Sequence, residues 1–258
     1  MLADLGAEVI VVHRKVADTS PAKTDTSILD RGKRSIALDL KEADDVSLFR
    51  SLAASADGLI EGFRPGVMER LGLGPDALLP LNPTLVYGRM TGWGQTGPRA
   101  QVAGHDLNYV ATAGLSGVTG ADGVATTLGV QVADIAGGAL YPVIGIVSAL
   151  YERVTTGRGR MVDASMTDGV AGLGIMMHAR QHLDGEPIGP GEDGLAGSQI
   201  CYRVYRCADG RHLAVGALEP KFWQALCEAL GVPELKHDGL ASGARKAKAE
   251  AQISALLA

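Results

Sequence analysis

Two apolar segments, Asp57-Gly58-Leu59-Ile60-Glu61-Gly62-Phe63 and Thr84-Leu85-Val86-Tyr87-Gly88-Arg89-Met90, have the length and residue types of buried β-strands. Between them lie two short helical patterns, over 67–71 and 75–79, and the second has Pro75 in its first turn. Strands that alternate with helices at this spacing are typical of βαβ units and a mostly parallel sheet. These segments therefore predict an α/β fold.

The same alternation extends from this unit toward both ends of the chain. We expect further strands over 8–13, 35–40 and 160–165, a polar loop over 15–34, and helices over 41–56, 134–153 and 166–183. The helix over 134–153 is apolar on most faces, so we expect it to be buried, with Pro142 as the candidate position of a kink. No Gly-x-Gly-x-x-Gly motif stands at a strand-to-helix turn, so dinucleotide binding has no support.

The pattern changes in the C-terminal third of the chain. Residues 184–199 are rich in Gly, Pro, Asp and Glu, which is typical of a linker. After it, two strands over 200–207 and 211–216 flank an Asp209-Gly210 hairpin turn, and helices follow over 220–230 and 244–257. We therefore predict a large domain over 1–183, a linker over 184–199 and a small α/β domain over 200–258.

Composition limits the class of protein. The 258 residues are 46% hydrophobic and 21% charged, as in a soluble globular protein, and the net charge of −5 argues against nucleic-acid binding. Cys201, Cys207 and Cys227 lack metal-ligand spacing, which favours reduced thiols in a cytosolic protein. No apolar run reaches membrane-spanning length, and the first residues do not form a signal peptide. We expect a cytoplasmic protein with no membrane or nucleic-acid partner.

Two titratable side chains stand out in the middle of the chain. His105 lies in Gly104-His105-Asp106-Leu107-Asn108-Tyr109, and Asp134 lies in Val132-Ala133-Asp134-Ile135. Each is near the start of an apolar helical pattern, and together they are suited to moving a proton if they meet in space. Structural explanations remain open, because an Asp often caps a helix N-terminus and a His at a helix start is often only a satisfied polar residue.

Basic residues and potential metal ligands also have both functional and structural interpretations. Arg14 follows the strand over 8–13, and open α/β sheets bind ligands at the carboxyl ends of their strands. The cluster Arg31-Gly32-Lys33-Arg34 is either a solvated surface or a binding place for phosphates. His178 and His182 have the spacing for sharing a metal, but no third ligand accompanies them, so we expect no metal site.

Several motifs in one order resemble those of the family III CoA-transferases (CaiB/BaiF), and most closely those of their α-methylacyl-CoA racemase branch. The resemblance covers essentially the whole chain, at Arg31–Ser35, Gly62–Gly66, Gly92–Pro98, Gly104–Tyr109, Tyr205–Gly210 and Ala214–Pro220. It implies a Rossmann-like CoA-binding domain and a small α/β domain in an interlocked homodimer with active sites shared between subunits. It also implies that a first strand and a C-terminal return to the large domain are missing here.

The resemblance also implies roles for particular residues. His105 and Asp134 would be the acid/base pair, with Glu219 supporting the histidine. Arg14 would meet the CoA phosphates, with Arg31, Lys33 and Arg34 near the nucleotide. We expect Arg64, Gly92, Asn108 and Tyr109 to belong to the same CoA site.

The activity implied is epimerisation of the α-carbon of a 2-methylacyl-CoA through an enolate, stabilised by N–H groups at the start of the Asp134 helix. No cofactor is expected beyond the CoA of the substrate itself. Segments 128–131 and 197–200 depart from the racemase pattern, which leaves the acyl group open. Two alternatives remain: a CoA-transferase with Asp134 as covalent nucleophile, and a truncated member that binds CoA without turnover.

Overall fold

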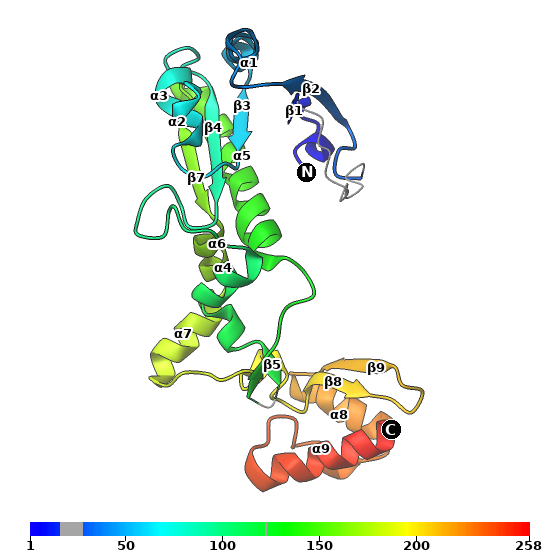
Figure 1. Ribbon diagram of the computed structural model, residues 1–258. Helices are drawn as coiled ribbons and strands as arrows, with labels where there is room; N and C mark the ends of the chain where they lie inside the picture. The colour runs from blue at the N-terminus through cyan, green and yellow to red at the C-terminus, as the bar shows by residue number, and fades with distance from the viewer. Residues whose placement is uncertain (16–27, 122) are drawn as a thin grey trace. The chain divides into compact units, whose positions relative to one another are not determined.

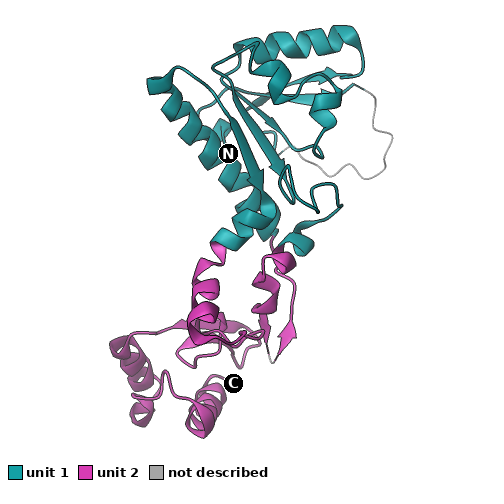
Figure 2. Ribbon diagram, turned by 90° about the vertical axis from the view of Figure 1, so that its left-hand side faces the viewer, with its two compact units in different colours: residues 1–109, 131–172 teal, residues 110–130, 173–258 magenta. Residues whose placement is uncertain are grey.

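The computed structural model describes residues 1–15, 28–121 and 123–258 (Figure 1). Most of the loop predicted over 15–34 therefore lies outside the described residues. The chain divides into two compact units, coloured separately in Figure 2. Unit 1 comprises Met1–Tyr109 and Gln131–Gly172, and unit 2 comprises Val110–Val130 and Leu173–Ala258. The predicted domain boundaries at 184 and 200 both fall inside unit 2 and stay a prediction.

Unit 1 contains two parallel sheets. Strands β3 (Gly58–Glu61), β4 (Val86–Thr91) and β7 (Met161–Ser165) form a three-stranded sheet in the order β3-β4-β7. Strands β1 (Val9–Arg14) and β2 (Lys33–Leu38) form a second, two-stranded one. Every pairing in these two sheets is parallel, which confirms the α/β prediction.

A set of short helices connects these strands and supplies an apolar core. They are α1 (Ala43–Ser55), α2 (Val67–Arg70) and α3 (Pro75–Leu78), preceded at the N-terminus by the 3₁₀ turn η1 (Ala3–Leu5). The buried side chains are Ala53, Met68, Leu73, Leu78, Leu85 and Tyr87. Asn82 donates from Nδ2 to the carbonyl oxygens of Ala53 and Ala56, so it satisfies two orphan acceptors at the end of α1.

The long apolar helix has two parts. A π-helix, η3 (Val132–Leu140), continues directly into α5 (Tyr141–Thr156). Pro142 stands in the first turn of α5, directly after the change from π-helix to α-helix. Ile146 and Ala149 are buried against the sheet, but Tyr151 and Val154 are 80% and 81% exposed. The expected burial on most faces is wrong, because only one face of α5 meets β4 and β7.

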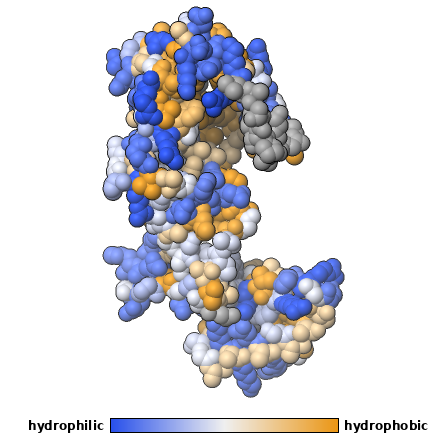
Figure 3. Space-filling model, viewed as in Figure 1, coloured by the Kyte–Doolittle hydropathy of each residue, from blue (hydrophilic) through white to orange (hydrophobic). Residues whose placement is uncertain are grey.

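The combined helix formed by η3 and α5 also has the length and composition of a membrane-spanning segment. Val132–Thr156, 25 residues long, is apolar and long enough to cross a bilayer, so the expectation that no apolar run reaches that length is wrong. Neither Gly137, Gly138 nor Pro142 interrupts the helix. One such helix is weak evidence, since a core helix of a soluble protein passes the same test. Exposed apolar side chains are not confined to it, and hydrophobic surface appears at many places on the face in Figure 3.

Unit 2 has its own core under an antiparallel hairpin. Strands β8 (Tyr202–Arg206) and β9 (His212–Gly216) form the hairpin, as predicted, and α8 (Pro220–Ala229) and α9 (Gly243–Leu257) follow it. The buried side chains include Ile200, Cys201, Tyr205, Trp223, Cys227 and Ile253. All three cysteines are free thiols.

Several shorter elements were not expected from the sequence. Strands β5 (Gly120–Ala121) and β6 (Val124–Ala125) form a small hairpin. The helix predicted over 166–183 is two helices, α6 (Met166–Leu173) and α7 (Ile175–Asp184), which separate at Gly174. Short 3₁₀ turns make up the remainder, at η2 (Leu115–Gly117), η4 (Gly194–Ala196) and η5 (Pro233–Leu235).

Candidate active site

His105 stands at the start of helix α4 (Asp106–Thr112). The Asn108 side chain reaches back one turn, and its Oδ1 accepts the His105 N–H at 3.0 Å. In the opposite direction, the Asn108 N–H donates to the His105 carbonyl oxygen at 2.8 Å. This reciprocal pair resembles a capping box and fixes the backbone of the histidine. The predicted role of Asn108 in CoA binding remains a prediction.

Asp134 stands in the first turn of η3 and is joined to the start of α4. Its N–H donates to Oδ1 of Asp106 at 2.9 Å. The next N–H, of Ile135, donates to the carbonyl oxygen of Gln131 at 3.0 Å. Both N–H groups therefore have acceptors within the chain, and the enolate stabilisation expected from N–H groups at the start of this helix stays a prediction.

The hydrogen bond also brings three titratable groups into one neighbourhood. Partial burial raises the pKa of the Asp134 carboxyl, the nearby Asp106 carboxylate raises it further, and the positive charge available to His105 opposes them. A carboxyl that holds its proton closer to neutral pH is better suited to acid/base work than an ordinary surface aspartate. The charges of Asp106 and His105 thus both act on the Asp134 carboxyl.

The Tyr109 ring lies near Asp134, and its position requires glycine at two neighbouring backbone positions. Its buried ring lies against the backbone of Gly92 and Gly104: a Cβ on Gly92 would be 2.2 Å from the ring Cζ, and one on Gly104 would be 2.7 Å from Cε1. Trp93 meets the ring edge-on at 4.8 Å between centroids. Burial and the Asp134 charge raise the pKa of Tyr109, and Arg64 opposes them, so Arg64 belongs to the same neighbourhood.

Helix η3, which carries Asp134 in its first turn, packs closely against α6. A Cβ on Gly169 would lie 2.2 Å from the Gly137 carbonyl oxygen, and one on Gly137 would lie 2.6 Å from that of Met166. Only glycines allow this approach of two backbones. Thr167, in the first turn of α6, donates from Oγ1 to the Gly92 carbonyl oxygen at 2.7 Å, so α6 also holds the loop after β4.

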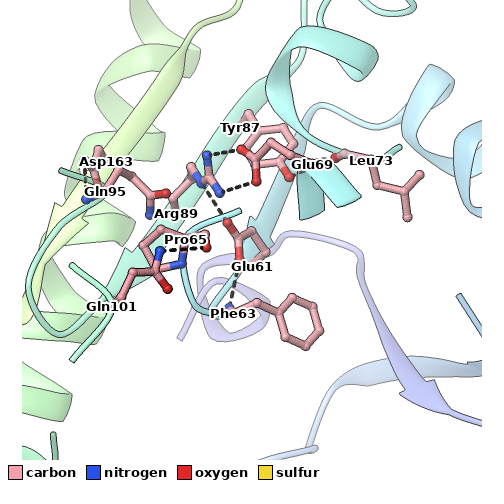
Figure 4. Close-up of polar contacts among 10 residues, drawn as sticks. All are labelled: Glu61, Phe63, Pro65, Glu69, Leu73, Tyr87, Arg89, Gln95, Gln101 and Asp163. Atoms are coloured by element: carbon pink, nitrogen blue, oxygen red, sulfur yellow. Dashed lines mark hydrogen bonds and ion pairs between the residues drawn. The ribbon is translucent and has the colours of Figure 1, made fainter. Parts of the chain in front are cut away.

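An ion network around the buried Arg89 and Glu61 supports the turn that begins at Phe63 (Figure 4), and Arg64 follows Phe63 in the chain. Arg89 on β4 donates from Nε to Oε1 of Glu61 at 2.7 Å and from Nη1 to Oε1 of Glu69 at 2.6 Å. Oε2 of Glu61 accepts the Phe63 N–H at 2.8 Å, at the beginning of the turn. Further along, Gln101 donates to the Pro65 carbonyl oxygen at 3.1 Å, so the turn is held from two sides.

The basic residues predicted to bind phosphates lie on the surface of unit 1. Arg14 ends β1 and is exposed, and it forms no ion pair within the described ranges of the chain. Arg31 pairs with Asp4 at 2.8 Å, Lys33 with Asp30 at 3.9 Å, and Arg34 with Glu8. Such exposed pairs contribute roughly 0–1 kcal/mol each, so an arriving phosphate could exchange with the carboxylates. Both sequence-based interpretations of the cluster remain open.

Glu219 belongs to unit 2, whereas His105 and Asp134 belong to unit 1. It is an exposed residue just before α8, and its carbonyl oxygen accepts the Phe222 N–H at 2.9 Å. Its support of the histidine stays a prediction. Within the described part of the chain, no three His, Cys, Asp or Glu side chains form a group that could hold a metal ion.

Three further residues contribute to this geometry without a role predicted from the sequence: Asp106, Glu61 and Arg89. Asp106 lies in the histidine motif, and an acid in the first turn of a helix is a recognisable signal. Glu61 and Arg89 are directly paired across β3 and β4, and their register became visible only in the sheet.

Comparisons with known proteins agree with this architecture. Alpha-methylacyl-CoA racemase of Mus musculus is 41% identical over 97% of this chain and 68% of its own length. Acetyl-CoA:oxalate CoA-transferase of Acetobacter aceti is 35% identical over 92% of this chain and 63% of its own. The crystal structure of a CAIB/BAIF family protein from Brucella suis superposes with a TM-score of 0.82 at 30% identity, over 99% of this chain and 71% of that one.

The chain thus spans about two thirds of the length of these curated relatives. The family model described as CoA-transferase family III matches residues 1–258. Together with the parallel sheets and the structural match, this confirms the predicted fold class. The chain belongs to CoA-transferase family III.

Proposed function

We propose that this protein is an isomerase that epimerises the α-carbon of a 2-methylacyl-CoA thioester, with His105 and Asp134 as its acid/base pair. The observation that supports it most is the junction of α4 and η3, where the Asp106–Asp134 hydrogen bond brings the two groups into one neighbourhood. The racemase relative supports the choice of substrate class.

The chemistry requires two proton transfers. One group of the pair takes the α-proton, and the electron pair of the broken C–H bond moves into the thioester to form an enolate. The other group then delivers a proton to the opposite face of the same carbon, so that substrate and product have the same atoms. The raised pKa of Asp134 suits it to hold a proton in one direction of the reaction and to accept one in the other.

The remaining residues serve binding and support in this proposal. Arg14, Arg31, Lys33 and Arg34 bind the phosphates of CoA, and Arg64, Gly92, Asn108 and Tyr109 form the part of the site near the thioester. Glu219 supports His105 from the second subunit of an interlocked homodimer. No group beyond the substrate's own CoA takes part.

Transfer of CoA between carboxylic acids is the second candidate, because a CoA-transferase is 35% identical to this chain. In that reaction Asp134 attacks the thioester carbonyl carbon, the C–S bond breaks and CoA leaves as a thiolate, so that the acyl group remains on Asp134 as a mixed anhydride. The racemase relative is the more similar of the two, at 41% identity, which favours the isomerase. CoA binding without turnover is a third candidate.

The decisive experiment is α-proton exchange. The purified protein is incubated with a 2-methylacyl-CoA in D2O, and deuterium incorporation at the α-carbon is followed by NMR. We expect exchange in the wild type and a loss of about 10²–10⁴-fold in His105→Gln and in Asp134→Asn.

Each competing candidate predicts a different result. Trapping of an acyl group on Asp134 by hydroxylamine, without exchange, would favour the transferase. A CoA-dependent rise in melting temperature with neither exchange nor trapping would favour the binding protein. Size-exclusion chromatography on the same sample tests the homodimer.

A further inference from the structure

We propose that the carboxylate of Asp106 is a positioning group that ties the start of η3 to the start of α4 and so sets the Asp134 carboxyl beside His105. The inference rests on the proposed function for its consequence in catalysis. Its geometric part concerns a single contact, from the Asp134 N–H to Oδ1 of Asp106 at 2.9 Å, between residues 28 apart in the chain.

The course of the chain explains why such a tie is needed. The chain leaves unit 1 after Tyr109, within α4, and returns to it at Gln131, just before η3. The intervening residues, Val110–Val130, belong to unit 2. The Asp106–Asp134 hydrogen bond therefore joins the outgoing and returning segments close to the points where they cross between units. Local chain geometry alone would leave the two helix starts free to shift.

The Asp106–Asp134 hydrogen bond affects the position of both members of the proposed acid/base pair. Asp106 follows His105 directly, and the backbone of His105 is itself held by the Asn108 side chain at 3.0 Å. On the other side, η3 is seated against α6 through the Gly137–Gly169 contact. Asp106 thus connects two rigid supports. A displacement of about 1 Å at a reacting group can lower a rate about 10²-fold, so this connection matters for catalysis.

The choice of an acid at this position adds a second effect. A helix start needs only an oxygen acceptor, which asparagine supplies as well as aspartate. The carboxylate also faces Asp134 with a negative charge and raises its pKa, against the opposing charge of His105. Tyr109 and Arg64 are two further ionisable groups in this neighbourhood. Asp106→Asn therefore separates charge from geometry, while Asp106→Ala removes both.

The test measures the pH profile of α-deuterium exchange in the full-length chain with a 2-methylacyl-CoA. We expect Asp106→Ala to lower exchange about 10–10²-fold at every pH and Asp106→Asn to recover most of that loss. In Asp106→Asn the limb of the profile that reports Asp134 should move to lower pH. Asp44→Asn, which changes an exposed first-turn aspartate of α1, should leave the profile unchanged.

A second measurement does not depend on turnover. NMR follows the amide hydrogen exchange and the carboxyl titration of Asp134 in the absence of substrate. Faster amide exchange in Asp106→Ala, together with a lower Asp134 pKa in Asp106→Asn, supports the positioning role even if the wild type shows no α-exchange. An unchanged amide and an unchanged titration in these folded variants would overturn it, whatever the activity.

Discussion

Asp134 is a carboxyl group whose ionisation the fold opposes. It is partly buried, it lies beside a second carboxylate, and both effects raise its pKa above the ordinary value of 3.8. The native state therefore retains a proton over a pH range in which the unfolded chain has already lost it. In the proposed mechanism this carboxyl transfers a proton at the expense of stability, which is a common compromise at functional sites.

Replacing this residue should stabilise the protein at neutral pH. Between pH 3.8 and the higher folded pKa, the native state binds more protons than the unfolded state, so the free energy of unfolding falls as pH rises through that window. Asp134→Asn removes this loss. We expect the variant to be more stable than the wild type at neutral pH, with the difference disappearing as the pH falls toward 3.8. Urea unfolding across this pH range measures the difference.

Asp44→Asn is the matched control, since Asp44 is an exposed first-turn aspartate with no described contact of this kind. An Asp134→Asn variant that is less stable than the wild type at neutral pH, in a sample with intact secondary structure, would contradict the prediction.

Between strands and helices, the most consequential contact is the ion network around Arg89. Arg89 and Glu61 are each 5% exposed and lie opposite each other on the parallel strands β4 and β3. Glu69 on α2 closes the network, and its hydrogen bond with Arg89 lowers the pKa of Glu69. Through the Glu61–Phe63 bond, the same network supports the turn that carries Arg64. The register of β3 and β4 thus supports the turn that carries Arg64.

Removing the shared cation should be strongly destabilising. In Arg89→Met the Glu61 carboxylate stays buried with no compensating charge, which costs about 3–5 kcal/mol. Arg34→Met is the control, because Arg34 pairs with Glu8 on the surface and its loss costs at most about 1 kcal/mol. Urea unfolding at neutral pH compares the two.

A double variant separates charge from packing in this network. Adding Glu61→Gln to Arg89→Met should recover part of the lost stability, because the uncompensated carboxylate is then gone. Equal losses in the Arg89 and Arg34 single variants would show that the network contributes no more than an exposed pair.

Considered as a whole, the chain has two units with separate apolar cores. Leu78 is fully buried in unit 1 and Ile253 is fully buried in unit 2. The two tryptophans of the sequence are divided in the same way, with Trp93 in unit 1 and Trp223 in the core of unit 2. Separate cores can unfold in separate transitions, and each unit has its own fluorescent reporter.

We expect an alanine substitution in one core to shift only the unfolding transition that the tryptophan of the same unit reports. Ile253→Ala should cost about 2–5 kcal/mol in the transition reported by Trp223 and leave the Trp93 transition in place. Leu78→Ala should do the reverse. The measurement is urea unfolding by fluorescence in Trp93→Phe and Trp223→Phe backgrounds. Coincident shifts of both reporters in either variant would mean that the units unfold as one.

Most strands and helices could be predicted because their signals are local. Val9–Arg14 is recognised by its β-branched and apolar run, and the β8–β9 hairpin by Asp209-Gly210. Short elements such as β5 and β6 were not predicted, because two residues are too few to show a hydrophobic period. The exposed face of α5 escaped for another reason: hydrophobicity predicts which residues favour burial, but what covers them depends on the rest of the fold.

What the sequence by itself determined is the parallel α/β class, the order of its elements, and the presence of a histidine and an aspartate near two helix starts. Only the tertiary structure decided that Asp106 joins these two starts, that Arg89 meets Glu61 and Glu69, and that glycines at 137 and 169 let η3 approach α6. The physical reason is distance along the chain. These contacts arise from strand register and helix packing between remote segments, and no local period in the sequence encodes either.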